Sequence, residues 1–146
     1  MSKIEVSSLE LKAGFRAPVG HIFEAFTNEG MMSGYTQSPC KLDVKEGGAF
    51  SQFGGSVTGE FTKITKPSEL QMKWRFKEWD SEHYSLVTIK FEPLDSSSTK
   101  LTLTQTNIPH ADKFGHHGVV EKVTQGWDTF FFQRIQKILG YAKLEV

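Results

Sequence analysis

The sequence predicts a single α+β domain in which a curved antiparallel β-sheet wraps around a long C-terminal α-helix. Apolar and polar residues alternate in several segments before residue 108, a period of two that is typical of strands with one wet face. Beyond residue 119 the apolar residues recur instead at helical spacing. At 146 residues the chain can bury roughly two-thirds of the surface that it exposes when unfolded. We therefore expect residues 1–146 to form one domain with a substantial core.

The N-terminal segment is predicted to form a strand followed by short helices. Every second residue of the strand is apolar: Leu9, Leu11, Ala13 and Phe15. Pro18 suits the first turn of a helix, where a backbone N–H has no partner to lose. The apolar positions that follow at helical spacing are Val19, Ile22, Phe23 and Phe26. This helical segment is expected to end near Asn28 to Gly30.

Residues 41–107 are predicted to form about six short antiparallel strands. Turn-forming residues separate them: Gly47-Gly48, Gly54-Gly55, Pro67-Ser68, Trp79-Asp80-Ser81 and Asp95-Ser96-Ser97-Ser98. The clearest strand is residues 70–77, whose apolar residues Leu70, Met72, Trp74 and Phe76 face one side and whose polar residues Gln71, Lys73, Arg75 and Lys77 face the other. The same alternation continues at Val87, Ile89, Phe91, Leu101 and Leu103. One face of the sheet should therefore be buried.

A long helix is predicted after Ile108-Pro109 ends the last strand. Its apolar positions are Val120, Val123, Trp127, Phe130, Phe131, Ile135 and Ile138, and Gly140 should end it. About twenty residues of helix span about 30 Å, which is enough to cross the sheet. Because the dry face of the sheet needs a cover, the sheet should curve around this helix in a helix-grip arrangement.

Composition excludes several classes of function. Lys plus Arg and Asp plus Glu are balanced at 17 each, so no excess positive charge favours nucleic acid. The apolar runs are too short to cross a bilayer, and the N-terminus lacks the pattern of a secretion signal. Cys40 is the single cysteine and cannot form an internal disulfide. We expect a cytoplasmic protein that binds neither nucleic acid nor membranes.

The sequence offers little evidence for catalysis, a metal or a cofactor. His110, His116 and His117 could meet on a zinc ion, but adjacent histidines point apart on most backbones, so a solvated loop is expected. Cys40 could act as a nucleophile with a distant His83, although a lone cysteine is more often a small buried apolar residue. The paired glycines lack the strand-to-helix context of a phosphate loop and are expected to form turns. We therefore expect no catalytic site, no metal and no cofactor.

Two sets of residues could bind a partner or ligand. Large aromatic side chains could line a pocket for a small hydrophobic ligand, although core packing is preferred for them: Trp74, Phe76, Phe91, Trp127 and Phe131. Lys73, Arg75 and Lys77, with Lys63 near them, form a basic stripe on the wet face of the sheet. This stripe either serves solubility or steers the domain toward an acidic partner surface, and the sequence leaves both interpretations open.

Several motifs, in order along almost the whole chain, resemble a known family. They are Gly47-Gly48-Ala49-Phe50, Val57-Thr58-Gly59-Glu60-Phe61, Met72-Lys73-Trp74-Arg75-Phe76-Lys77-Glu78-Trp79, Gln125-Gly126-Trp127, Phe131-Phe132 and Leu139-Gly140-Tyr141. The sequence with these motifs resembles the C-terminal domain of the activator of the 90-kDa heat-shock protein ATPase. This resemblance implies membership of the START-like, birch-pollen-allergen-like superfamily.

The resemblance also implies a function by binding. It implies a cytosolic co-chaperone that binds the 90-kDa heat-shock protein and stimulates its ATP turnover without hydrolysing anything itself. Two-domain members of the family carry an additional N-terminal domain that contacts the middle segment of the chaperone, so this chain is either a single-domain form or one piece. The alternatives on the same scaffold are a carrier or sensor of a small hydrophobic ligand and an enzyme of polyketide-cyclase type. The enzyme would need inward-facing acid and base groups, and His83 is the candidate to check.

Overall fold

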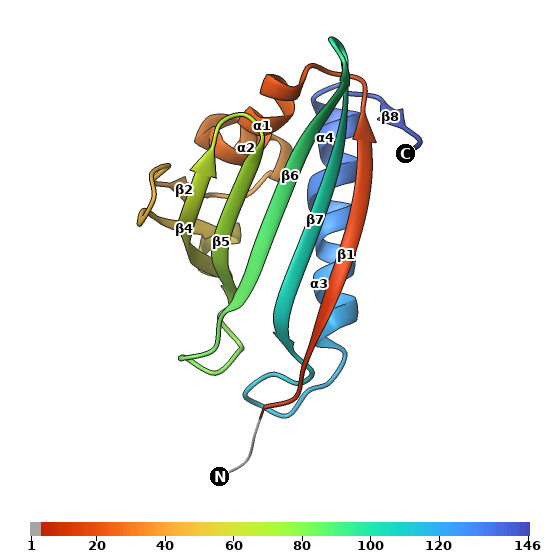
Figure 1. Ribbon diagram of the computed structural model, residues 1–146. Coiled ribbons are helices and arrows are strands. Elements are labelled where there is room, and N and C mark those ends of the chain that lie inside the picture. Colours follow the sequence, from red (N-terminus) through yellow and green to blue (C-terminus); the bar gives the residue numbers. More distant parts are fainter. Residues whose placement is uncertain (1–3) are drawn as a thin grey trace.

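The computed structural model of the protein describes residues 4–146 (Figure 1). An eight-stranded antiparallel sheet has the strand order β2-β3-β4-β5-β6-β7-β1-β8. Its strands are β1 (Val6–Phe15), β2 (Lys41–Leu42), β3 (Ala49–Gln52), β4 (Val57–Thr65), β5 (Glu69–Phe76), β6 (Ser85–Asp95), β7 (Ser98–Pro109) and β8 (Lys143–Leu144). The long C-terminal helix and the two short helices lie on one face of this sheet, which confirms the predicted helix-grip fold (Figure 1).

Two short helices follow the first strand, as expected. Helix α1 (Val19–Thr27) begins one residue after Pro18, and α2 (Glu29–Thr36) begins after Asn28. The Asn28 side chain accepts a hydrogen bond from the backbone N–H of Met31 at 2.9 Å and so caps α2. The Tyr35 hydroxyl donates to the carbonyl of Ala25 at 2.7 Å, which fixes α2 against α1. Together these helices close one end of the core.

The sheet has the predicted turns, but two of its strands are long. Gly47 and Gly54 have positive φ angles of 86° and 65°, a conformation that glycine adopts at little cost in tight turns. Strands β6 and β7 contain 11 and 12 residues, so the expectation of uniformly short strands was wrong. No turn-forming pair interrupts residues 85–94 or 98–109, and the two strands form one long hairpin along the C-terminal helix (Figure 1).

The C-terminal helix is continuous over residues 119–138 but contains a wider turn. Its parts are α3 (Val119–Gly126), a π-helical turn η2 (Trp127–Phe132) and α4 (Gln133–Ile138). A π-turn has more residues per turn than an α-helix and therefore shifts the phase of the buried stripe. As a result Phe131 and Phe132 are both buried, whereas Phe130 is 42% exposed. The spacing had placed Phe130 and Ile138 on the apolar stripe, and that prediction was wrong for both.

Aromatic rings fill the space between the helices and the sheet. Phe26 of α1 stacks on Phe131 of the long helix at 5.9 Å between ring centroids. Tyr35 meets the same Phe131 edge to face at 6.2 Å, and Trp74 of β5 lies 5.8 Å from Trp127.

Among the described residues no helix is long and apolar enough to cross a membrane.

Candidate functional site

An apolar groove lies between the C-terminal helix and strands β4 and β5, and it holds about 140 Å³. Four of the five residues predicted to line a pocket line this groove: Trp74, Phe76, Trp127 and Phe131. Phe91 does not, because it packs against Phe23 and Phe26 of α1, with ring centroids 5.4 and 5.8 Å away. The exposed surface of the groove is almost entirely apolar. We refer to this feature below as the apolar groove.

Three further residues shape the apolar groove. Gly126 has no side chain, so the helix presents bare backbone to the groove. Phe53 lies in a short 3-10 turn, η1 (Phe53–Gly55), with a φ of 54°, a left-handed conformation that costs a bulky side chain of order 1–3 kcal/mol. Edge-to-face contacts of 5.7 Å between ring centroids hold Phe53 against Phe130 and Phe131. The rim therefore contains a strained aromatic residue and an exposed one.

A buried polar chain lies beneath the apolar groove. The Trp127 indole N–H donates to Gln105 Oε1 at 2.7 Å, and Gln105 Nε2 donates to the Ser85 hydroxyl at 2.8 Å. That hydroxyl donates to the carbonyl of Trp74 at 2.7 Å. Sequence reasoning missed Gln105, although the period of two from Leu101 places it on the inward face. This chain ties the long helix to β5, β6 and β7.

Two cations lie over aromatic rings that line the apolar groove. Lys122 Nζ lies 4.9 Å from the centroid of the Phe76 ring, and the Arg134 guanidinium lies 5.2 Å from that of Phe130. Both distances are within the range of a cation–π interaction. Of residues 4–146, Lys122 is the one charged residue that lines the groove. In the described part of the chain neither cation forms an ion pair.

The predicted basic stripe lies on the outer face of β5, but its three members differ in their surroundings. Lys73 is half exposed, at 50%, and its Nζ is 3.9 Å from Glu60 of the neighbouring strand. Lys77 is exposed and follows the end of the strand. Arg75 is half-buried and makes three hydrogen bonds to backbone carbonyls, including 2.6 Å to Trp79 and 2.9 Å to Ser81. Arg75 therefore holds the β5–β6 loop, whereas Lys73 and Lys77 are exposed, Lys73 with Glu60 as its neighbour.

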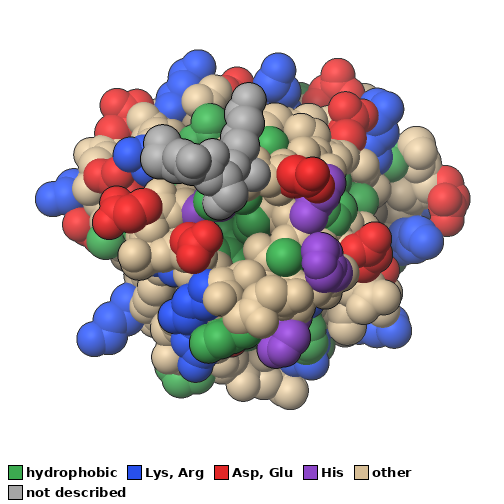
Figure 2. Space-filling view, turned by 90° about the horizontal axis from the view of Figure 1, so that it is seen from below, with side chains coloured by type: hydrophobic (Ala, Val, Ile, Leu, Met, Phe, Trp, Pro, Cys, Tyr) green, Lys and Arg blue, Asp and Glu red, His purple; other side chains and the backbone are tan. Residues whose placement is uncertain are grey.

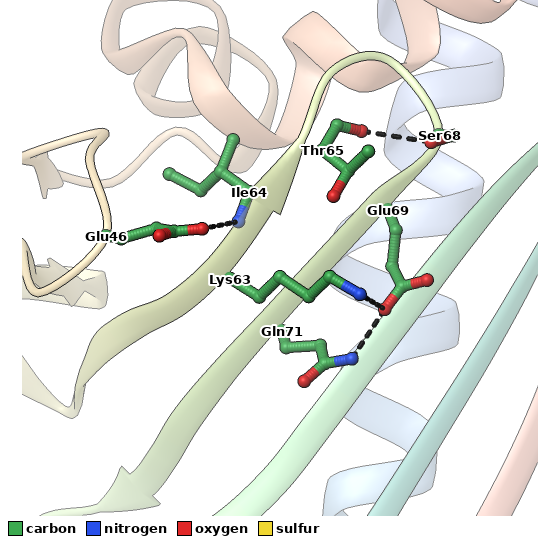
Figure 3. A network of polar contacts seen from close by, with 7 residues as sticks. All are labelled: Glu46, Lys63, Ile64, Thr65, Ser68, Glu69 and Gln71. Carbon is green, nitrogen blue, oxygen red and sulfur yellow. Dashed lines mark hydrogen bonds and ion pairs between the residues drawn. The ribbon is translucent and has the colours of Figure 1, made fainter.

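Lys63 belongs to a separate polar network at the other end of β4 and β5 (Figure 3). Its Nζ lies 3.6 Å from the Glu69 carboxylate, which also accepts a hydrogen bond from the Gln71 amide. This amide, together with Lys63, holds the pKa of Glu69 below its ordinary value. The Glu46 carboxylate accepts a hydrogen bond from the backbone N–H of Ile64 at 3.3 Å. Lys63 is therefore paired and is not an extension of the basic stripe.

Histidine side chains gather at the end of the molecule that carries the N-terminus (Figure 2). They come from the β5–β6 and β7–α3 loops: His83, His110, His116 and His117. His110 Nδ1 lies 3.4 Å from Glu5, and His116 Nδ1 lies 3.2 Å from Asp112. Within residues 4–146, no three or more His, Cys, Asp or Glu side chains are grouped so that they could hold a metal ion.

Cys40 and His83 have different partners on different elements. The Cys40 thiol lies between α2 and β2 and donates to the carbonyl of Glu29 at 3.4 Å. Burial, with a contribution from the Glu29 carboxylate, raises the pKa of this thiol and disfavours the nucleophilic thiolate. His83 lies in the β5–β6 loop, and its Nε2 is 2.8 Å from the carbonyl of Asn107 in β7. The structure does not bring these two residues together.

Comparison with known proteins shows relatives with a common description. The mouse protein "Activator of 90 kDa heat shock protein ATPase homolog 1" is 31% identical over 141 residues. This match covers 96% of the chain but only 39% of the mouse protein. The chain thus spans about two-fifths of the length of this relative.

Solved structures show a similarity to a protein of the same description. An HSP90 activator from Plasmodium falciparum superposes with a TM-score of 0.92 and is 40% identical, over 94% of this chain and 99% of that one. CalU16 from Micromonospora echinospora has a TM-score of 0.70 at 20% identity, which shows a common fold alone. A family model described as "Activator of Hsp90 ATPase homolog 1-like protein" matches residues 16–140. Since this match spans most of the described sheet and the long helix, the chain belongs to the family of activator of Hsp90 ATPase homolog 1-like proteins.

Proposed function

We propose that this protein binds the 90-kDa heat-shock protein and stimulates its ATPase, and that it acts by binding and not as an enzyme. The observation that carries this proposal is the 40% identity to the Plasmodium falciparum HSP90 activator over nearly the whole of both chains. The activator names of the curated relatives support the same function. Its location in the cytosol stays a prediction from the sequence.

Stimulation without catalysis has a simple thermodynamic basis. A chaperone that hydrolyses ATP slowly spends little time in its hydrolysis-competent conformation. A protein that binds this conformation more tightly than the others raises its population in proportion to the difference in affinity. In this proposal no side chain of the domain needs to touch ATP. Only a surface complementary to the competent chaperone is required.

The basic stripe is the surface that we propose for the first encounter with the chaperone. Lys73 and Lys77 are exposed, and charges of this kind steer an acidic partner and mainly raise the association rate. Arg75 is left out of the test, because its loss would also release the β5–β6 loop.

Reversing both lysine charges, in the double variant Lys73→Glu and Lys77→Glu, is expected to weaken binding roughly tenfold at low salt. The loss of affinity should be smaller at 0.5 M salt, because salt at that concentration limits interactions between exposed charges to a few ångströms. The measurement is a fluorescence titration of the labelled domain with the purified chaperone at both salt concentrations.

A matched control variant distinguishes an effect of the basic stripe from an effect of net charge. The double variant Lys12→Glu and Lys143→Glu changes the net charge equally, but its lysines lie on β1 and β8, away from β5 in the sheet order. Equal weakening by both double variants would remove the basic stripe from the proposal. Failure of the unaltered domain to bind would contradict the proposed function itself.

The dimensions of the apolar groove make a carrier of hydrophobic ligands the weaker candidate. Pockets for small molecules typically hold roughly 300–1,000 Å³. The apolar groove holds about 140 Å³ and is open on one side. It is therefore better suited to a single side chain than to an enclosed lipid.

A further inference from the structure

The apolar groove has the size of one large side chain. A cavity of about 150 Å³ lined by apolar residues accepts a ring the size of benzene. The apolar groove holds about 140 Å³ between the long helix and β5. Because it is open, a ring or branched chain could enter it from a partner without any rearrangement of the core.

Gly126 keeps this groove open, and the fold gives no other reason for a glycine there. Its φ of −61° and ψ of −46° are ordinary helical values that any residue adopts. A Cβ built on Gly126 meets no atom within 4 Å. Glycine is the worst residue after proline for the interior of a helix, so alanine would stabilise this position. What a side chain at 126 would do is fill the groove.

The charges around the groove point to an acidic occupant. Lys122 lines the groove and lies over the ring of Phe76. Arg134 lies over the ring of Phe130, which borders the groove, and its Nη1 also donates to the carbonyl of Thr36 at 3.1 Å. The two acidic residues of this helix line other hollows: Asp128 lies beside β1 and β8, and Glu121 lies beside His110. Glu78 and Asp112 line a neighbouring hollow that Lys122 and Phe76 also border, and neither lines the groove. An apolar floor with a cationic rim complements an apolar side chain that is flanked by carboxylates.

We propose that the apolar groove receives one large apolar side chain from an acidic segment of a partner protein, with Lys122 and Arg134 pairing with the flanking carboxylates. The partner is taken to be the 90-kDa chaperone, and in that respect the inference rests on the proposed function. The strained Phe53 is a consistent feature, since backbone strain accumulates where a ligand is clamped.

The first experiment tests the groove without the chaperone. A capped peptide with the sequence Glu-Asp-Phe-Asp-Glu is titrated into the 15N-labelled protein, and backbone amide shifts are followed by NMR. The expected result is a saturable shift centred on Gly126 and its neighbours. Peptides with Ala in place of Phe, or Lys in place of the acids, should bind at least fivefold more weakly. Absence of a shift at the groove, or equal binding of all three peptides, would overturn the inference.

The second experiment uses the chaperone and the variant Gly126→Leu, which fills the groove with a good helix former. The variant should unfold at a urea concentration no lower than the unaltered protein and yet bind the chaperone at least tenfold more weakly. Gly34→Leu is the matched control, because Gly34 is also a helical glycine whose Cβ would meet no atom within 4 Å, and it does not line the groove. Unchanged binding by Gly126→Leu would overturn the docking of the chaperone in the groove.

The outcomes separate the two proposals. If the unaltered protein binds the peptide but not the chaperone, the proposed function fails and the groove stands as a site for acidic segments. If it binds the chaperone equally well with Gly or Leu at position 126, the function stands and the inference fails. A small apolar molecule found in the groove by native mass spectrometry, displaced by Leu at position 126 and not by the peptide, would also overturn it.

Discussion

Replacing Trp127 by alanine is expected to lower the free energy of unfolding by about 3–5 kcal/mol, the range for deletion of a large buried aromatic side chain. Trp127 is 2% exposed and lies 4.8 Å from Phe131 between ring centroids. Its loss would leave a cavity and would also leave the buried amide oxygen of Gln105 without its hydrogen-bond donor, the Trp127 indole N–H. Urea denaturation followed by circular dichroism measures the change.

The milder substitution Trp127→Phe isolates the hydrogen bond. It keeps a ring in the core but leaves the buried Gln105 oxygen without a donor, which is expected to cost about 1–3 kcal/mol in addition to the loss of ring volume. Thr129→Ala, on the exposed side of the same helix, should change stability by less than about 0.5 kcal/mol. If Trp127→Phe is as stable as the unaltered protein, the buried polar chain does not hold the helix to the sheet.

The second large effect is expected for Gly59→Ala in β4. A Cβ at this position would collide with the carbonyl oxygen of Lys73 and would lie 2.5 Å from Cζ of Phe50. Phe50 packs its ring over the bare backbone of Gly59, its partner in the sheet register. Both neighbouring strands must shift to admit a methyl group, so we expect a loss of about 1–3 kcal/mol or more.

The control for Gly59 is a glycine with space around it. Gly20 lies in α1, and a Cβ there meets no atom within 4 Å. Gly20→Ala should therefore raise stability by about 0.5–1 kcal/mol, because alanine is the better helix former. Thermal unfolding of both variants gives the comparison. A neutral Gly59→Ala would show that the packing of β3, β4 and β5 is looser than described.

Sequence pattern alone predicted the sheet well because strand periodicity leaves a strong signal. In β5 the predicted inward residues Leu70, Met72 and Trp74 are all buried, and Lys73 between them is exposed. The turns could be predicted because glycine, proline and short polar residues favour turn conformations through their own local geometry, which does not depend on tertiary contacts. The period of two also predicts that Gln105 faces inward. This position was overlooked because only apolar residues were assigned to the core.

The long helix was harder to predict in detail. A periodicity of 3.6 residues cannot register a π-turn, because the extra residue depends on how the helix packs on the sheet. For that reason the pattern placed Phe130 on the buried stripe, although the π-turn brings Phe132 inward instead. The groove that Phe130 borders could therefore not be outlined from the sequence.

The sequence pattern indicated the surroundings of some candidate site residues but not of others. Trp74 and Trp127, which the sequence grouped together, lie 5.8 Å apart between ring centroids, because the sheet and the long helix face each other there. Phe91 was grouped with them on its strand phase alone, and phase does not reveal how far along a strand a neighbouring helix lies. The role of Arg75 in holding a loop depends on carbonyl positions in the β5–β6 connection, which no sequence pattern contains.

The most direct measurement is the steady-state ATPase rate of the purified 90-kDa chaperone as this protein is titrated into it. We expect that the rate rises and saturates, that the chaperone's active-site inhibitor abolishes the whole signal, and that the protein alone hydrolyses no ATP. The same titration with an added N-terminal domain from a longer relative tests whether tethering to a second site increases the effect. An ATPase rate that stays at its basal value throughout, with and without that added domain, would contradict the proposed stimulation of the chaperone.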